Sequence, residues 1–331
     1  MARPARAFRE LTAIAPAPKI AVVIPCYNEE LTIADVVHQF RDQLPDADIY
    51  VFDNNSTDKT VERAREAGAL IYRERRQGKG YVVQSMFSRV DADVFVMVDG
   101  DGTYPPADVQ RIIEPVLEDE ADMVVGSRLD QESRSQFRFL NRLGNKLFLW
   151  VLNLIFKVRL SDILSGYRAF NRKFVKNIPL FGGGFEIETE LTIKALERGY
   201  RITEVPVDLG RRPEGSYSKI KLLRDGWLIL STIFRLFRDY KPLAFFGSIG
   251  MAMIAAAFIP GAVVIYEFIE TGLVPRLPSA VLAVGMVLSG MLLIVVGLIL
   301  HTIARRFNEI EHQLMSMSED TRAVRNTETR A

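Results

Sequence analysis

The chain has 331 residues, enough for one α/β domain of about 230 residues plus a membrane segment. Its formal net charge is +1, so it is not a polycation and gives no general signal for nucleic-acid binding. A single cysteine excludes an internal disulfide framework and a cysteine-rich metal site. We expect this residue, Cys26, to be a small buried side chain rather than a nucleophile.

Residues 1–18 form an N-terminal arm that carries Arg3, Arg6 and Arg9. The arm lacks a long apolar core and therefore does not resemble a secretory signal peptide. We expect the catalytic part of the chain that follows to stay in the cytoplasm.

Strands and helices alternate over the next hundred residues. Short apolar runs predict five buried strands, at Ile20–Pro25, Ile49–Phe52, Ala69–Tyr72, Val94–Val98 and Asp122–Gly126. Helical periodicity predicts four helices between them, at Thr32–Gln43, Thr60–Ala67, Gly80–Val90 and Ala107–Glu118. This alternation predicts an α/β domain with a mostly parallel sheet and helices on both faces.

Polar residues follow three of these strands, at the edge where such sheets bind ligands. They are Asn28 and Glu29, Asp53 to Asn55, and Asp99 with Asp101. Two carboxylates at the mouth of a buried strand repel each other unless a cation lies between them. Mg²⁺ or Mn²⁺ would serve, and these ions prefer oxygen ligands shared with substrate phosphates. The pattern therefore predicts a diphosphate substrate.

The glycine-rich phosphate loops of other nucleotide-binding proteins are missing from the sequence. No G-x-G-x-x-G follows the first strand, and no glycine-rich loop ends in Gly-Lys-Ser or Gly-Lys-Thr. Gly78–Gly80 is only a fragment of such a loop. A dinucleotide-binding or ATP-hydrolysing protein would need that backbone cradle.

The region near residues 140–158 changes character. Leu147–Leu152 is too apolar for an ordinary surface helix and too short to span a bilayer, and basic residues flank it. This pattern predicts a helix that lies in the membrane interface. A buried core helix is the alternative.

Two long uncharged stretches follow, Pro242–Tyr266 and Leu277–Leu300. At 1.5 Å per residue each reaches about 36 Å, enough to cross a hydrocarbon core of about 30 Å. We therefore predict two transmembrane helices, at about 242–268 and 277–301. Basic residues before the first and after the second place both termini in the cytoplasm by the positive-inside rule, so the protein would be a multi-pass protein of the cytoplasmic (inner) membrane.

After the second span, Ile303, Phe307, Ile310 and Leu314 recur at spacings of four, three and four. This stripe predicts a helix that packs on another subunit or on the chain's own domain, and we expect a homo-oligomer. The polar end, Glu319–Ala331, is expected to be disordered. The predicted plan is an arm at 1–18, a catalytic domain at 19–224, a juxtamembrane amphipathic helix at 225–241, two spans within 242–304 and a helix with a tail at 305–331.

Seven motifs in order resemble family 2 glycosyltransferases of the GT-A fold. They are Ile24–Glu30, Asp53–Thr60, Gly78–Gly80, Asp99–Asp101, Gly126–Arg128, Ser165–Arg168 and Ser216–Lys219. The last three resemble the polyprenyl-phosphate branch, which includes dolichol-phosphate mannose synthase and the bacterial undecaprenyl-phosphate glycosyltransferases. The resemblance covers roughly residues 18–225 and implies a GT-A catalytic domain, Rossmann-like with a mostly parallel sheet, followed by a two-helix transmembrane hairpin.

The resemblance also implies a nucleotide-sugar site. Its binding residues would be Pro25, Tyr27, Glu29, Asp53, Lys79, Asp99 and Gly100. Asp101 would be the metal ligand, and Asp53 would accept hydrogen bonds from the base. Asp53 and Asp58 have a simpler interpretation as caps of a turn and helix, which we favour for Asp58 only.

The sequence departs from the family pattern in two places. Asn54 stands where relatives often have a second acid, and Thr103 stands where some have a glutamine that assists the metal. Water could supply the remaining metal ligands, because Mg²⁺ usually keeps several waters.

Basic residues between the sheet and the spans match an anionic acceptor, because the planar fork of arginine fits phosphate. The implied acceptor-phosphate residues are Arg128, Arg134, Arg138, Ser165, Arg168, Arg212 and Lys219. Contact with lipid headgroups is an equal alternative for Arg134 and Arg138.

The implied reaction is an inverting transfer of one sugar to polyprenyl phosphate, with Asp101, Asp99 and Arg168 as catalytic residues. A phosphate oxygen is already a nucleophile, so no strong base is required, and the metal would stabilise the leaving diphosphate. Glu186 and Glu190, one helical turn apart, either contact sugar hydroxyls or belong to a solvated helix face.

The predicted product is a lipid-linked sugar for a cell-envelope glycan or lipopolysaccharide. A processive polysaccharide synthase is a rival, but neither Trp150 nor Trp227 is preceded by the arginine of its signature motif. A non-catalytic nucleotide-sugar-binding subunit is the other rival. UDP-glucose, a UDP-N-acetylhexosamine, a UDP-uronate and GDP-mannose all remain open as donors.

Overall fold

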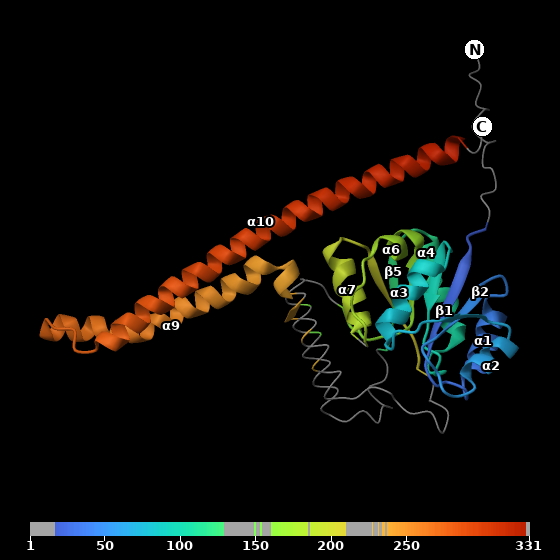
Figure 1. Cartoon of the computed structure of the whole chain (residues 1–331), viewed down its shortest axis with the longest axis horizontal. Coiled ribbons are helices and arrows are strands. Elements are labelled where there is room, and N and C mark those ends of the chain that lie inside the picture. Colours follow the sequence, from blue (N-terminus) through green and yellow to red (C-terminus); the bar gives the residue numbers. More distant parts are fainter. Residues whose placement is uncertain are drawn as a thin grey trace, which may run out of the picture. The chain divides into compact units, whose positions relative to one another are not determined.

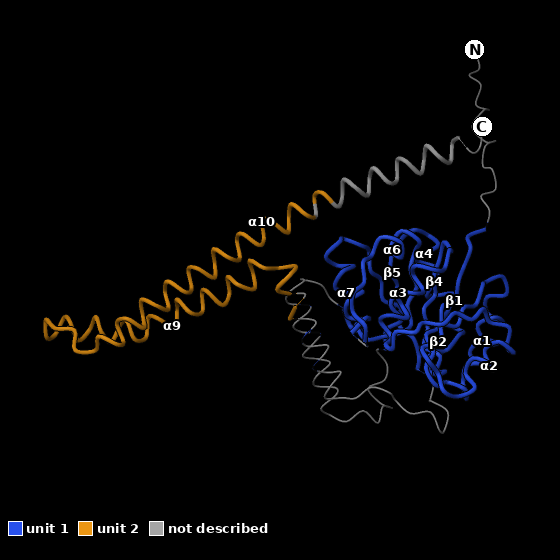
Figure 2. Tube along the Cα trace, viewed as in Figure 1, with its two compact units in different colours: residues 1–232 blue, residues 233–331 orange. Residues whose placement is uncertain are grey.

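The computed structural model describes residues 17–128, 149, 153, 160–184, 186–209, 227, 231, 234, 235 and 237–328. Side chains of the last helix are described as far as residue 310, except that of residue 308. The chain divides into two compact units, residues 1–232 (unit 1) and 233–331 (unit 2) (Figure 2). The predicted interfacial helix lies outside the described residues, apart from Leu149 and Asn153, which are both helical.

Unit 1 is built on a seven-stranded sheet in the order β3-β2-β1-β4-β6-β5-β7 (Figure 1). The strands are β1 Ile20–Cys26, β2 Asp48–Asp53, β3 Leu70–Arg73, β4 Val94–Met97, β5 Met123–Ser127, β6 Arg168–Asn171 and β7 Ile202–Pro206. Strand β6 runs antiparallel to both of its neighbours, and every other pairing is parallel. The predicted mostly parallel sheet is confirmed, and β6 and β7 are additions to it.

Helices cover both faces of this sheet. They are α1 Ile33–Gln43, α2 Thr60–Glu66, α3 Lys79–Arg89, the short 3₁₀ helix η1 Pro106–Asp108, α4 Val109–Leu117, α6 Arg172–Asn177 and α7 Ile187–Glu197. Val22 and Ile24 of β1 pack in one apolar cluster with residues of α1, α2 and α4. Ala21 and Val23 point the other way, into a cluster with α3, α6 and α7. Side chains that alternate along a strand thus build two cores.

The strand register brings three loops to one edge of the sheet. Cys26 pairs with Asp53, and Val23 pairs with Met97, so β1, β2 and β4 end close together. The loops after these strands carry the polar residues that the sequence places at a ligand site. This common edge follows from parallel pairing, which aligns the carboxyl ends of neighbouring strands.

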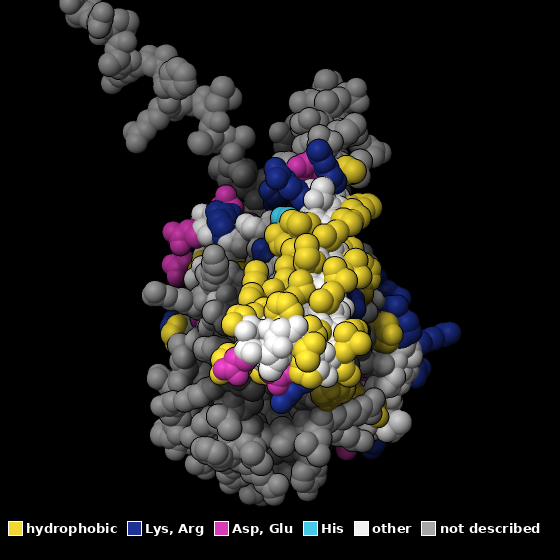
Figure 3. Space-filling model, turned by 90° about the vertical axis from the view of Figure 1, so that its left-hand side faces the viewer, with side chains coloured by type: hydrophobic (Ala, Val, Ile, Leu, Met, Phe, Trp, Pro, Cys, Tyr) yellow, Lys and Arg dark blue, Asp and Glu magenta, His cyan; other side chains and the backbone are white. Residues whose placement is uncertain are grey.

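The described part of unit 2 contains two long helices, α9 Pro242–Thr271 and α10 Leu277–Glu328. Gly272 ends α9 with φ +68°, a left-handed conformation that suits glycine. Pro242–Thr271 and Leu277–Phe307 are long and apolar enough to cross a membrane. Figure 3 shows hydrophobic side chains gathered over this hairpin.

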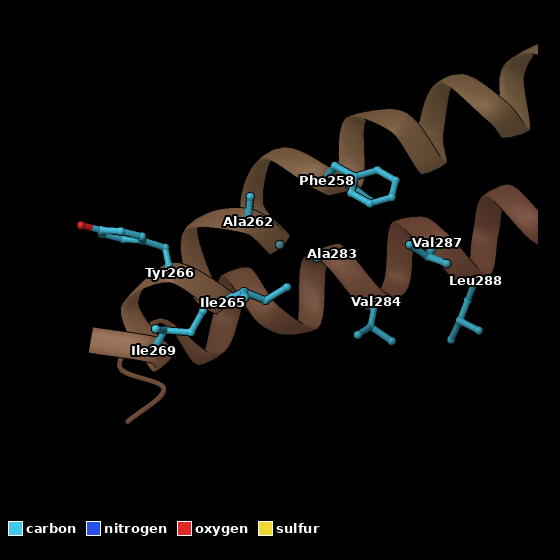
Figure 4. A pocket seen from close by; sticks show the side chains of 11 residues that line it. Phe258, Ala262, Ile265, Tyr266, Ile269, Ala283, Val284, Val287 and Leu288 are labelled. Carbon is cyan, nitrogen blue, oxygen red and sulfur yellow. The ribbon is translucent and has the colours of Figure 1, made fainter. Parts of the chain in front are cut away.

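Small residues let α9 and α10 approach closely. A Cβ on Gly250 would lie 2.5 Å from the carbonyl oxygen of Gly290, and one on Gly297 would lie 3.3 Å from Leu243 Cα. Nearer the connecting loop, a groove of about 570 Å³ lies between the helices and is lined by side chains such as those of Phe258, Ile265 and Leu288 (Figure 4). Close packing of small residues is what holds helices together where water provides no driving force.

The end of α10 differs from the prediction. The sequence predicts disorder from Glu319, but the helix continues to Glu328. Neither glycine nor proline follows Gly297, and extending a helix that already exists avoids the cost of nucleation. The helical stripe predicted from Ile303 onward is confirmed as helix.

Candidate active site

The loop after β4, Asp99–Asp101, is fixed against the end of β1. Thr32 Oγ1 donates a hydrogen bond of 2.6 Å to the carbonyl oxygen of Gly100. A Cβ on Gly100 would lie 2.7 Å from Cys26 Sγ, so only glycine fits there. Cys26 is itself 2% exposed, which confirms the expected buried side chain. The loop therefore has a defined position before any ligand binds.

Asp101 is buried, and Thr103 orients its carboxylate. Asp101 Oδ1 accepts hydrogen bonds from Thr103 N at 3.1 Å and Thr103 Oγ1 at 2.6 Å. Among the described residues, no group of three or more His, Cys, Asp or Glu side chains converges on one point. A divalent ion at Asp101 would therefore draw its other ligands from substrate phosphates and water, as Mg²⁺ commonly does.

Lys79 bridges two carboxylates at the first turn of α3. Its Nζ lies 2.6 Å from Asp99 Oδ1 and 2.5 Å from Glu188 Oε1. Burial lowers the pKa of Lys79, but Asp99 and Glu188 outweigh burial and raise the pKa above its ordinary value. The lysine thus stays cationic and ties the loop after β4 to α7.

The glycine segment Gly182–Gly184 packs on the start of α3. Gly80 N donates to Gly183 O at 3.2 Å, and a Cβ on Gly80 would overlap the carbonyl group of Gly182. Gly78–Gly80 is therefore a docking surface for a second loop. This contact explains why two glycines flank Lys79.

Two glutamates of α7 and its first turn hold that glycine segment. Glu190 accepts hydrogen bonds from the backbone of Phe181 and Gly182, at 3.0 and 2.8 Å. Glu186 Oε1 accepts from Gly183 N and Gly184 N at 3.2 and 3.1 Å. Both carboxylates are buried, so the solvated helix face that we considered is wrong.

Asp53 and Asn54, at the end of β2, face different partners. Asp53 is buried, its Oδ1 accepts from Ser56 N at 3.0 Å, and its Oδ2 lies 3.8 Å from Arg73 Nε. These residues line a hollow of about 450 Å³. Asn54 donates to the carbonyl groups of residues 74 and 76 and accepts from Gly78 N at 2.7 Å. Asn54 therefore fixes the loop before α3.

The end of β1 contributes Pro25 to the same edge, and the loop after it contributes Tyr27 and Glu29. Tyr27 is 38% exposed, and Glu29 N donates to Thr60 Oγ1 at 2.8 Å. Asp58 Oδ1 accepts from Thr60 N at 3.0 Å, in keeping with the turn role that we favoured for it.

The loop Leu160–Tyr167 lies directly against Asp99. A Cβ on Gly166 would overlap the Asp99 carboxylate, and Gly166 N donates to Tyr104 Oη at 2.9 Å. Glu204 of β7 accepts from the backbone N–H groups of Ser161 and Asp162. The predicted donor and acceptor motifs, far apart in the sequence, therefore meet here.

Arg128 lies beside this loop with a bidentate partner. Its Nε and Nη2 lie 2.5 and 2.8 Å from the two oxygens of Asp162. Burial lowers the pKa of Arg128, but the hydrogen bonds with Asp162 raise the pKa by more. The pKa of Arg128 therefore lies above its ordinary value. About a quarter of the side chain stays exposed, so Arg128 can still meet an anion.

Arg168 requires a correction. The resemblance implies that Arg168 touches the acceptor, but this residue is fully buried. Its guanidinium donates to Ser165 O, Ile163 O and Thr192 Oγ1 at 2.8–2.9 Å. Ser165 is also fully buried. Both residues shape the loop from inside, and neither reaches an acceptor in this conformation.

Four predicted acceptor residues, Arg134, Arg138, Arg212 and Lys219, lie outside the described residues. The residues that sequence reasoning missed are anchors of the loops: Thr32, Tyr104, Asp162 and Glu204. Each acts through a partner far away in the sequence, and no local motif marks them.

The sequence of the chain is similar to proteins of known family. The sequence model of the family "Glycosyl transferase family 2" matches residues 21–178. Glycosyltransferase AglJ of Haloferax volcanii is 34% identical over 281 residues, which cover 85% of this chain and 92% of that protein. Dolichyl-phosphate hexose transferase of the same organism is 32% identical over 195 residues, 58% of this chain and 83% of that protein.

The fold is similar to that of solved glycosyltransferase structures. The crystal structure of glucosyl-3-phosphoglycerate synthase from Mycobacterium tuberculosis with Mn²⁺ and UDP-glucose aligns with a TM-score of 0.56 and 25% identity. The alignment covers 71% of this chain and 84% of that one. The chain therefore belongs to glycosyltransferase family 2 and is a glycosyltransferase with the GT-A fold.

Proposed function

We propose that this enzyme transfers one sugar from a nucleotide diphosphate sugar to polyprenyl phosphate, with inversion at the anomeric carbon. The observation that carries the proposal is the contact between the Asp99–Asp101 loop and the Leu160–Tyr167 loop, with Arg128 beside them. This contact would bring the carboxylate for a metal ion, Asp101, and the cation for an acceptor phosphate, Arg128, to one edge of the sheet. Relatives named as dolichyl-phosphate transferases support this acceptor.

The donor half would lie over the ends of β1, β2 and β4, with Pro25, Tyr27, Glu29 and Gly100 around the nucleotide. We favour UDP over GDP. Asp53 Oδ1 already accepts from Ser56 N, which leaves Oδ2 beside Arg73 Nε. Uracil offers one N–H between two carbonyl groups, which match Oδ2 as acceptor and Arg73 Nε as donor. Guanine offers two adjacent N–H donors, one of which would have to share Oδ1 with Ser56 N.

Asp101 fits as the one protein ligand of Mg²⁺ or Mn²⁺, because its carboxylate is fixed by Thr103 at the mouth of the site. A bound divalent ion would supply Lewis-acid stabilisation of the leaving diphosphate. A similar structure that contains Mn²⁺ with UDP-glucose supports this assignment.

The chemical step needs no general base. An acceptor phosphate oxygen forms the bond to the anomeric carbon while the bond from that carbon to the diphosphate oxygen breaks, and no proton is transferred. Arg128 would hold the acceptor phosphate, and Arg134, Arg138, Arg212 and Lys219 are proposed to assist. Lys79 keeps Asp99 in place, while Ser165 and Arg168 shape the acceptor loop.

We further propose that α9 and α10 cross the cytoplasmic membrane as a hairpin, with both termini and unit 1 in the cytoplasm. The two apolar helices and the basic residues that flank them support this topology. The helix at 225–241 and the interfacial segment near 140–158 would bring the acceptor phosphate to unit 1. The lipid-linked product would then serve envelope glycan or lipopolysaccharide synthesis.

A transfer assay tests the proposal. Purified full-length protein in detergent receives labelled UDP-glucose, UDP-N-acetylglucosamine, UDP-glucuronate or GDP-mannose, with polyprenyl phosphate and Mn²⁺ or Mg²⁺. We expect metal-dependent label in the lipid fraction from a UDP-sugar, lost in Asp101→Ala and kept in Asp91→Ala, an exposed carboxylate far from this edge of the sheet.

Each other outcome contradicts one part of the proposal. Transfer from GDP-mannose alone would refute the UDP preference. Label in a long polymer would favour a processive synthase. Nucleotide binding without labelled lipid from any donor would favour a non-catalytic binding subunit.

A further inference from the structure

Helix α10 extends well beyond the hairpin. The start of α9 lies beside Gly297, because a Cβ there would meet Pro242, Leu243 and Phe246. From that point α10 continues to Glu328. These roughly 30 residues make a helix about 45 Å long that α9 is too short to accompany. The extension must find its stability elsewhere, because isolated helices are marginal in water.

The extension carries an apolar stripe that the rest of unit 2 leaves uncovered. Ile303, Phe307 and Ile310 are 47%, 68% and 53% exposed. Their spacing of four and three continues in the sequence at Leu314 and Met317. An average spacing of 3.5 residues is the heptad repeat of a left-handed coiled coil rather than the wider stripe of a helix on a globular core.

We propose that a second copy of this chain covers the stripe, through a parallel, in-register coiled coil of the two α10 extensions. This inference rests on the proposed membrane topology but not on the proposed reaction. Copies inserted in the same direction in one membrane present their helices in parallel. A lipid bilayer would cover the stripe only to about Phe307, where the apolar span ends. Ile310 lies beyond that point, next to the charged Glu309, and needs a cover other than lipid.

Charges beside the stripe favour this arrangement. When Ile303 and Ile310 are assigned to d positions of the heptad, Arg306 and Asp320 fall at g positions. The e position five residues after Arg306 is Glu311, and the e position five residues after Asp320 is Arg325. Parallel coiled coils pair g of one helix with the following e′ of the other, and both of these pairs have opposite charge. Arg306 also pairs with Glu309 of its own helix at 2.9 Å, but exposed pairs of this kind contribute little and exchange readily.

Disulfide cross-linking in native membranes tests the inference. Ile310→Cys would place thiols at the seam, and Arg305→Cys would place them at the outer f position. Arg305 is more exposed than Ile310, at 75% of its side chain, so random collision would favour the control. The wild-type chain controls for Cys26, which is buried.

We expect mild oxidation to give a covalent dimer with Ile310→Cys and at least about tenfold less with Arg305→Cys. Adding Arg306→Glu to Ile310→Cys should reduce the dimer, and adding Glu311→Arg as well should restore it. Equal cross-linking of both cysteine variants, or none in Ile310→Cys, would overturn the coiled coil.

A second measurement keeps the inference testable if the thiols react poorly. Light scattering of detergent-solubilised protein should give a multiple of the chain mass for wild type and a single chain for Ile310→Asp. Sugar transfer per chain should stay within about twofold, because Ile310 is outside the catalytic edge. A monomeric wild type whose unfolding temperature drops on Ile310→Asp would instead place the stripe on the chain's own unit 1 and refute a second copy.

Discussion

Lys79→Met should destabilise the enzyme through the two carboxylates that it leaves behind. Lys79 lies within 2.6 Å of both Asp99 and Glu188, and Glu188 is only 5% exposed. Removing one partner of a buried ion pair costs about 3–5 kcal/mol, because the remaining charge has no compensation. We expect about 3 kcal/mol here, since Asp99 still reaches solvent. For a domain of this size, that loss corresponds to a fall of roughly 6–12 °C in unfolding temperature.

A double-mutant cycle separates this charge effect from lost packing. Glu188→Gln alone keeps the Lys79–Asp99 pair and should cost about 1 kcal/mol. The double variant Lys79→Met with Glu188→Gln removes the buried unpaired charge, so it should recover at least 1 kcal/mol relative to the sum of the single changes.

Thermal unfolding of full-length protein in detergent, followed by intrinsic fluorescence, measures the cycle. Lys19→Met is the matched control, because Lys19 forms an exposed pair with Asp48 at 3.0 Å, and it should cause no resolvable shift. Additive single and double changes, or a Lys79→Met variant as stable as the control, would refute the assignment of Lys79 as a buried charge bridge.

Three further predictions concern other parts of the site. Thr103→Val removes the hydroxyl hydrogen bond of 2.6 Å that orients Asp101 and keeps the backbone one, so the metal concentration for half-maximal transfer should rise about tenfold, with Thr103→Ser as the rescuing control. Gly80→Ala should destabilise the protein, because the alanine Cβ would overlap the Gly182 carbonyl group. This overlap should outweigh the advantage of about 1 kcal/mol that alanine has over glycine within a helix. Gly285→Ala, where a Cβ meets nothing within 4 Å, is the control, and equal unfolding temperatures for the two would contradict the docking contact. Finally, the hydrogen bonds from Arg76 lower the pKa of Glu74 to about 2, so this carboxylate stabilises the fold above its unfolded pKa of about 4.5 and loses that effect as pH falls from 4.5 towards 2. Unfolding temperature measured against pH should fall less steeply across that window in Arg76→Ala, and parallel curves for variant and wild type would contradict the pairing.

The central strands could be predicted from the sequence because their signal is local. In β1 and β4, and in β2 between its two terminal aspartates, every residue is apolar, which is typical of strands covered on both faces. Their predicted bounds agree with the structure to within about two residues. Once those strands are parallel, Asp53, Asp99 and Asp101 must share one edge, so the candidate site follows from the order of the strands.

Strands β6 and β7 could not be predicted in the same way. Strand β6 begins with Arg168, and β7 contains Glu204 and ends with a proline. Charged residues at such positions lower the expectation of a buried strand. They are tolerated because each is satisfied by a partner far away: Arg168 by Thr192 Oγ1, and Glu204 by the backbone of Ser161.

Three charged residues near the site are buried for one physical reason. Arg168, Glu186 and Glu190 are charged, and charged residues usually mark solvent or ligand contact. Here Arg168 donates to backbone carbonyl groups, while Glu186 and Glu190 accept from the N–H groups of Gly182–Gly184. A loop without regular structure leaves such backbone groups unpaired, and a buried side chain of matching polarity is one way to satisfy them. For the two arginines, exposure separates a ligand contact from a structural role: the exposed quarter of Arg128 can meet an anion, whereas the fully buried Arg168 fixes the neighbouring loop.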